Sequence, residues 1–338
     1  MERARKMMRQ VLPWCWLGVM VIALCCGGCA VPCQDQSCYN QEPAGVQIAG
    51  EGGTAPGTTP PIAKPPASVL PSNPEPVPNP QPETPPEEVS GKCPRSNGNL
   101  AEPGVYTVAT LPGGPDFTIY YPKEMDGVCK HPFVAWGNGF GVSDVTIYDP
   151  MLKHLASHGF VVMASHSALA DGGFVHREGL DYMIKQNATA GSPFYGKIAV
   201  DEGATVGHSR GGCGATAGGD HKSVKAVVDI QGWGTATKPT LYLTGTEDVY
   251  TAMNQGAFAT TSGPAFLANF QGADHVTPTT APGSSGKVQP QFKRLMIGWL
   301  RCFVLDDEEA CALFKGFPNC DICKDPGWAK LDAKKLPQ

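Results

Sequence analysis

The chain has 338 residues and a formal net charge of −5, and no basic stripe points to a nucleic-acid partner. Thirteen cysteines are many for a reducing compartment and favour an oxidising one, where disulfides persist. The 32 prolines and 41 glycines exceed the usage of an ordinary globular chain, so their placement decides where the packed part lies.

The first 29 residues have the layout of a secretory signal. A basic head precedes the apolar run VLPWCWLGVMVIAL and the small-residue stretch CCGGCA. Cys29 follows two glycines and is a candidate lipid-attachment site, as in bacterial lipoproteins. We predict a signal peptide over residues 1–29 and a secreted or envelope-anchored protein. Lipid anchoring to the membrane, plain cleavage and an uncleaved anchor remain the alternatives.

Residues 30–91 have a different composition, with a proline every few positions and few large apolar side chains. Such a segment cannot bury enough surface to offset its ordering entropy, so we predict a disordered, semi-rigid linker. The pattern becomes globular after it. We predict one catalytic domain over residues 92–338, with a cysteine-rich C-terminal extension, and expect a monomer.

Apolar runs rich in Val, Ile, Phe and Tyr alternate with helical patterns after residue 116. The predicted strands are 117–122, 132–137, 160–166, 197–200 with 204–209, 225–231, 239–245 and 264–271. The predicted helices are 145–159, 175–187 and 291–305. This alternation predicts an α/β fold with a doubly wound, mostly parallel sheet, helices on both faces and no large lid.

The pattern GHSRG places Ser209 between two glycines, after an apolar strand and before a small-residue stretch that can begin a helix. A nucleophile elbow needs this arrangement, because the serine sits on a sharp turn where neighbouring backbones leave no room for a Cβ. We therefore predict that Ser209 is a nucleophile. His208, beside it, is expected to shape the substrate pocket and is not expected to be the base.

A serine needs a base, and the base needs a carboxylate, which follow in the order Ser, acid, His in this class of fold. Asp248 follows the predicted strand 239–245, and His275 follows the next strand. Both therefore lie where open α/β sheets build their sites. Asp229 and Glu247 remain competing candidates for the acid.

The oxyanion of acyl transfer needs two backbone N–H donors near the serine. One is expected from Arg210, and the other from Phe140 in the loop GNGFG, with Gly139 behind it at the substrate. A plain glycine turn is the alternative interpretation of that loop.

Four blocks, LASHGFVVMAS, GHSRGG, KPTLYLTGTEDVYT and GADHVTPT, resemble in order those of the bacterial cutinases and poly(ethylene terephthalate) hydrolases. These belong to the wider dienelactone-hydrolase and chlorophyllase-like group. The resemblance spans roughly residues 104–314 and implies an α/β-hydrolase fold. It implies the catalytic set Ser209, Asp248 and His275, with Phe140 and Arg210 as oxyanion donors. It also implies a substrate-stacking role for Trp233, for which a packed aromatic is the alternative.

The sequence departs from that family near the acyl pocket. Arg210 stands where methionine is usual, GNGFG replaces a Pro-Gly-aromatic loop, and Asp274 and Val276 replace serine and phenylalanine. The implied function is a serine carboxylic ester hydrolase with an acyl-enzyme intermediate, no metal and no organic cofactor. The expected substrate is an ester. Because the site is expected to be open, it would also admit polymeric esters. The alternatives are a lipase or acyltransferase, or an inactive surface-binding module.

The cysteines of the folded part fit structural disulfides. Cys320 and Cys323 form a C-x-x-C without a second pair at zinc spacing, and a helix break after Leu305 would bring Cys302 and Cys311 together. Cys93 with Cys129 is a further candidate pair.

Overall fold

The computed structural model describes residues 94–284, 286 and 289–336. The predicted signal peptide and linker (1–29 and 30–91) lie outside the described residues, as does Cys93, so those predictions stay open. None of the helices in the described part combines the length and hydropathy that a membrane span requires.

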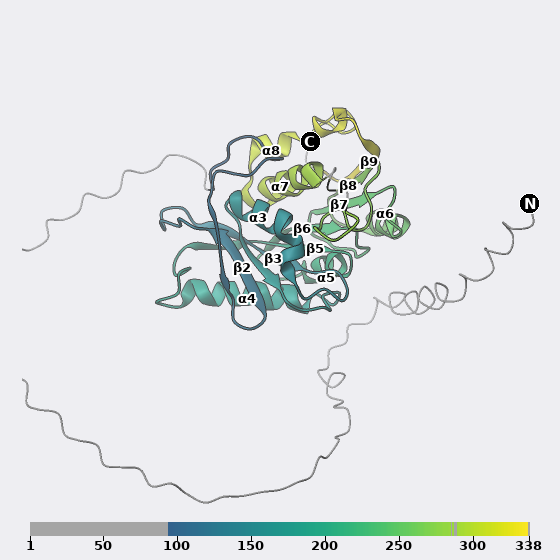
Figure 1. The fold of residues 1–338 in the computed structure, drawn as a ribbon. Helices are drawn as coiled ribbons and strands as arrows, with labels where there is room; N and C mark the ends of the chain where they lie inside the picture. The colour runs from purple at the N-terminus through teal and green to yellow at the C-terminus, as the bar shows by residue number, and fades with distance from the viewer. Residues whose placement is uncertain (1–93, 285, 287–288, 337–338) are drawn as a thin grey trace, which may run out of the picture. The chain divides into compact units, whose positions relative to one another are not determined.

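A nine-stranded sheet of order β1-β2-β4-β3-β5-β6-β7-β8-β9 forms the centre of the described residues (Figure 1). Four of its strands (His131–Gly137, Val161–Ser165, Thr240–Gly245 and Ala265–Phe270) are buried along their whole length, as expected for apolar runs covered on both faces. The strands are β1 (Val108–Pro112), β2 (Phe117–Pro122), β3 (His131–Gly137), β4 (Val161–Ser165), β5 (Ile198–His208), β6 (Val224–Ile230), β7 (Thr240–Gly245), β8 (Ala265–Phe270) and β9 (Trp328–Lys334).

The six adjacent strands from β4 to β8 run parallel, whereas β1, β2 and β9 run antiparallel to their neighbours. Gly137 at the end of β3 pairs with Gly207 near the end of β5, so these strands finish at one level. Parallel strands bring the loops at their carboxyl ends to the same rim of the sheet. The loops after β3, β5, β7 and β8 therefore meet there.

Helices cover both faces of the sheet. The helices α3 (Asp149–Ser157) and α7 (Gln289–Leu305) pack on one face, and α4 (Phe174–Ala188) and α5 (Arg210–Gly218) pack on the other (Figure 1). The helix α6 (Thr251–Thr260) contacts β7 and β8. Because each of these helices packs on strands, none of them forms a lid. This is the predicted α/β-hydrolase fold.

The helix predicted over residues 145–159 is divided. Residues Val145–Tyr148 form a 3₁₀ turn, η2, which Asp144 caps by accepting the Thr146 N–H at 2.9 Å. The helix α3 then begins at Asp149 with Pro150 in its first turn. Proline has no N–H to donate and suits the first turn of a helix, so the chain restarts its helix there.

The elements that were not predicted include β1, α6 and β9. The strand β9 pairs antiparallel with β8, and the Trp328 ring lies 4.2 Å from the Phe270 ring. The sequence of β9, WAKLDAK, has three charged residues and no β-branched one, so its strand character comes from pairing with β8 rather than from strong β propensity.

Two predicted disulfides are present. Cys302 in α7 pairs with Cys311 in α8 (Glu308–Ala312), with Cα atoms 4.6 Å apart, because α7 ends at Leu305 and the chain turns back. Cys320 pairs with Cys323. Disulfides favour an oxidising compartment for the folded protein. Cys129 is also a disulfide cysteine, and its predicted pairing with Cys93 concerns a residue outside the described range.

Candidate active site

Ser209 occupies the turn between β5 and α5 with φ 57° and ψ −120°, a conformation that side-chain-bearing residues rarely adopt. A Cβ on Gly207 would lie 2.1 Å from the Gly211 carbonyl oxygen. A Cβ on Gly211 would lie 2.0 Å from the carbonyl oxygen of Gly137. Both glycines are therefore required by close backbone contact, and the strand, turn and helix hold the Ser209 hydroxyl at the rim.

Two loops bring partners to this serine. His275 Nε2 lies 3.0 Å from Ser209 Oγ, and His275 Nδ1 lies 2.9 Å from Asp248 Oδ1. The Asp248 side chain is fully buried and also accepts the backbone N–H of Tyr250 at 3.0 Å. A carboxylate only accepts, so Nδ1 carries the proton and Nε2 of the neutral ring can take one from Ser209.

The competing acids lie elsewhere. Asp229 is buried and accepts the backbone N–H of Gly232 at 2.7 Å, and burial raises its pKa to about 7. Glu247 is exposed. Of the three carboxylates weighed from the sequence, Asp248 is the one that contacts His275.

The loop after β3 passes directly beside the serine, since a Cβ on Gly139 would lie 3.5 Å from the Cβ of Ser209. Phe140 follows in that loop, and none of the described residues accepts a hydrogen bond from its backbone N–H. Arg210 opens α5, so its N–H has no intrahelical acceptor. The Arg210 side chain turns outward, lying 4.7 Å from the Phe140 ring and 3.2 Å from Asp171.

Comparison with known proteins assigns this arrangement to a family. A search of curated proteins gave no match. A family model described as PET hydrolase-like matches residues 86–323, which is more than two thirds of the chain. The chain belongs to the PET hydrolase-like family. This membership confirms the resemblance noted in the sequence and the α/β-hydrolase fold, and it indicates a hydrolase that acts on esters.

Aromatic rings border the site of this PET hydrolase-like chain. The half-buried Trp233 lies 4.9 Å from Tyr250, whose ring lies 4.9 Å from the His275 ring in an edge-to-face arrangement. The Trp233 ring is therefore separated from the His275 ring by Tyr250, and its substrate-stacking role stays a prediction. Tyr250 was not predicted as a site residue. Its position two residues after Asp248, in the loop that follows a strand, indicates that it lies near the site.

The His208 side chain is held in place by hydrogen bonds. Its ring is buried, and both nitrogens are engaged, with Nε2 2.8 Å from the His275 carbonyl oxygen and Nδ1 3.0 Å from Tyr148 Oη. Both ring nitrogens thus have protein partners, and the expected role of His208 in shaping the substrate pocket stays a prediction. Tyr148 was missed, because it reaches this place from η2, 60 positions earlier.

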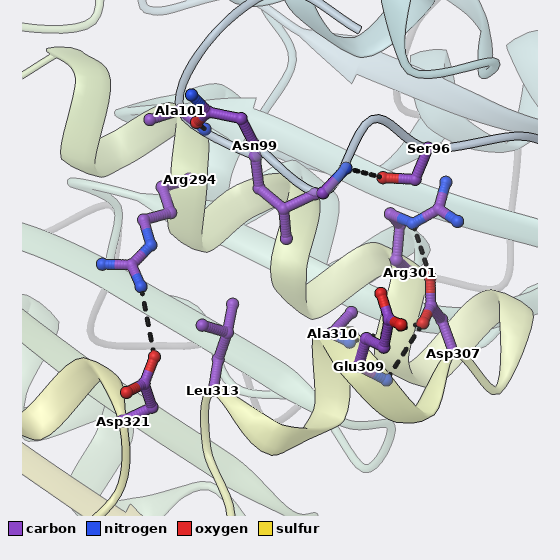
Figure 2. Close-up of a pocket in the computed structure, with 12 residues that line it drawn as sticks. Ser96, Asn99, Ala101, Arg294, Arg301, Asp307, Glu309, Ala310, Leu313 and Asp321 are labelled. Atoms are coloured by element: carbon purple, nitrogen blue, oxygen red, sulfur yellow. Dashed lines mark hydrogen bonds and ion pairs between the residues drawn. The ribbon is translucent and has the colours of Figure 1, made fainter. Parts of the chain in front are cut away.

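A cavity of about 490 Å³ lies away from these residues, between the start of the described chain and the helices α7 and α8 (Figure 2). Within it, Arg294 pairs with Asp321 at 3.4 Å and Arg301 pairs with Asp307 at 2.7 Å. Four of its five charged side chains are thus paired with one another, and none of the predicted site residues lines it.

Proposed function

We propose that this PET hydrolase-like chain is a serine carboxylic ester hydrolase whose catalytic triad is Ser209, His275 and Asp248. The observation that carries the proposal is the continuous line of hydrogen bonds, 3.0 Å from serine to histidine and 2.9 Å from histidine to aspartate. This line joins a weak nucleophile to a base and the base to an orienting carboxylate, which is what acyl transfer by serine requires.

In this mechanism Ser209 Oγ attacks the ester carbonyl carbon while His275 Nε2 takes the hydroxyl proton. Asp248 keeps the other ring nitrogen protonated and stabilises the imidazolium. The backbone N–H groups of Phe140 and Arg210 bind the oxyanion. The tetrahedral adduct then expels the alcohol, which takes its proton from His275, and leaves an acyl-enzyme. Water, activated by His275, hydrolyses that ester and frees Ser209.

The proposed substrate class is inferred from the residues at the edge of the site. Trp233 would stack on the acyl part of the ester, and Gly139 allows the substrate to approach the backbone. The loops after β3 and β7 carry exposed apolar side chains, with Phe140 65% and Val249 80% exposed. Such a rim suits an extended or polymeric ester better than a small enclosed one.

We also propose that the chain acts outside the cytoplasm. The disulfides of the folded part and the signal-like first 29 residues support export. Lipid attachment at Cys29 would place the enzyme on a membrane surface. Incorporation of labelled palmitate in a bacterial host, lost in Cys29→Ser, tests this step, and an unlabelled wild-type protein would refute it.

The test of the reaction is turnover of p-nitrophenyl acetate and butyrate by the purified protein beside Ser209→Ala. We expect the variant to lose activity by about 10⁶-fold. Absence of turnover by the wild-type protein would favour the surface-binding module, and equal turnover by the variant would refute the assignment of the serine. A panel from short acyl esters to triacylglycerols and insoluble polyesters, with and without an added alcohol acceptor, separates esterase, lipase and acyltransferase.

A further inference from the structure

A second line of hydrogen bonds runs through the rim behind Ser209. The backbone N–H of Gly139 donates to Tyr148 Oη at 3.0 Å, and Tyr148 Oη lies 3.0 Å from His208 Nδ1. His208 Nε2 lies 2.8 Å from the backbone carbonyl oxygen of His275. The line therefore begins in the loop of the proposed oxyanion donor and ends in the loop of the proposed base.

The direction of each bond follows from the groups involved. A carbonyl oxygen only accepts, so His208 Nε2 is the donor to His275. Burial lowers the pKa of His208 to about 3, and burial raises the pKa of Tyr148 to about 12, so both stay neutral at neutral pH. A neutral imidazole with its proton on Nε2 accepts at Nδ1. Tyr148 therefore donates to His208, and its oxygen accepts the N–H of Gly139.

The line is shielded from water and tightly fitted. Tyr148 is 1% exposed and His208 4% exposed, so solvent cannot replace a missing partner. The Tyr148 ring lies 5.2 Å from the ring of Trp136. A Cβ on Gly139 would lie 3.1 Å from Tyr148 Oη and 3.2 Å from His208 Nδ1. Any shift of one loop would therefore break or strain a buried bond.

The sheet by itself connects the two loops only indirectly. Phe140 follows β3 and His275 follows β8, and the strands β5, β6 and β7 lie between them. The side chains of Tyr148 and His208 span this distance with three hydrogen bonds.

We propose that Tyr148 and His208 are positioning residues, which hold the backbone N–H of Phe140 and the ring of His275 at a fixed separation around one ester carbonyl. The proposal rests on the proposed function. The neutral state of His208 serves the same end, since the two histidine rings lie 4.8 Å apart and a second positive charge would oppose formation of the His275 imidazolium.

The test compares Tyr148→Phe, His208→Leu and His208→Gln in the full-length protein. A stoichiometric p-nitrophenyl phosphonate counts the reactive sites, so that kcat is expressed per active site. We expect Tyr148→Phe and His208→Leu to lower kcat roughly tenfold or more, with KM changed by less than about twofold. The amide of His208→Gln can still donate to the His275 carbonyl, so this variant should recover part of the loss.

Two matched controls lie away from the rim. Tyr106 also accepts a backbone N–H, from Arg95 at 3.0 Å, and His131 is a buried histidine bonded to the Gly159 carbonyl at 2.8 Å. Tyr106→Phe and His131→Asn should keep kcat per active site within about twofold, even if they lower stability. Wild-type kcat per site in both Tyr148→Phe and His208→Leu would overturn the proposal, and so would a loss confined to KM.

A ¹⁵N NMR measurement of the histidine rings tests the hydrogen-bond network of Tyr148 and His208 independently of turnover. We expect His208 to stay neutral between pH 5 and pH 9 with its proton on Nε2, and Tyr148→Phe to shift the Gly139 and His275 amide signals. A proton on Nδ1, or unchanged amide signals, would overturn the proposal. If the wild-type protein does not turn over esters, the proposed function is refuted. The NMR result then tests the hydrogen-bond network by itself.

Discussion

The imidazole of His275 lies 3.0 Å from the hydroxyl oxygen of Ser209, although 66 positions separate the two residues in the sequence. Each residue follows a strand of the parallel part of the sheet, and the carboxyl ends of these strands meet at one rim. The pairing of this hydroxyl with the imidazole is thus a consequence of strand direction and order. The carboxylate of Asp248 reaches the same place from the end of β7.

Replacing the carboxylate should impair chemistry more than binding. Asp248→Asn would present an amide to His275 Nδ1 and favour the wrong ring tautomer, so we expect kcat to fall about 10⁴-fold with little change in KM. The control is Glu247→Gln, which changes an exposed neighbour and should keep kcat within about twofold. Steady-state kinetics with p-nitrophenyl butyrate measure both. A larger loss in Glu247→Gln than in Asp248→Asn would reverse the assignment of the acid.

The elbow glycines should tolerate no side chain. In Gly211→Ala the new Cβ would overlap the Gly137 carbonyl oxygen, so the backbone must move and we expect a loss of at least about 3 kcal/mol in unfolding free energy. Gly256 lies in α6, where a Cβ would meet no atom within 4 Å. Gly256→Ala should therefore stabilise the protein by about 0.5–1 kcal/mol. Urea unfolding of both variants checks the contrast, and equal effects would contradict it.

Stability should fall in mild acid because several histidines are buried in the neutral form. Burial lowers the pKa of four of them to about 3 or 4; they are His154, His158, His176 and His208. Below pH 6.5 the unfolded chain binds protons that the folded chain does not, so the unfolding free energy decreases as the pH falls. Each histidine contributes a slope of about 1.4 kcal/mol per pH unit in this window. His154→Gln keeps a donor but does not titrate, so urea unfolding from pH 7.5 to pH 4.5 should show a shallower slope. An identical slope in wild type and variant would contradict this account.

The last strand should contribute to stability through its tryptophan. Trp328 lies against Phe270 and donates its indole N–H to the Ile322 carbonyl at 2.8 Å. Because the ring is half-buried, we expect Trp328→Ala to lower the unfolding free energy by about 2 kcal/mol. Trp328→Phe keeps a ring and loses the hydrogen bond, so its loss should be about half as large. Thermal unfolding measures the effect. Equal unfolding temperatures for the wild type and Trp328→Ala would contradict a contribution of Trp328 in β9 to stability.

Much of this architecture could be predicted because its signals are local. The strand β5, the glycines around Ser209 and the start of α5 are contiguous, and the turn needs those residue types for steric reasons. Asp248 and His275 could be found because strand ends are recognisable and their order along the chain is constrained. Pro150 in the first turn of α3 is also a local signal, because proline favours the start of a helix.

What was missed depends on contacts between distant segments. Tyr148 meets His208 because η2 folds back over the rim, and neither residue has a local pattern that reveals its partner. The alternating polar sequence of β9 becomes a strand because β8 offers an edge to pair with. The resemblance ends near residue 314 and the family match ends at residue 323, so neither reaches β9.

The most direct test of the central claim is mass spectrometric mapping of the residue that a p-nitrophenyl phosphonate modifies in the purified protein. We predict one adduct per chain, on Ser209, formed with loss of p-nitrophenol and abolished in His275→Ala. An adduct on another residue, or unchanged labelling of Ser209→Ala, would contradict the account.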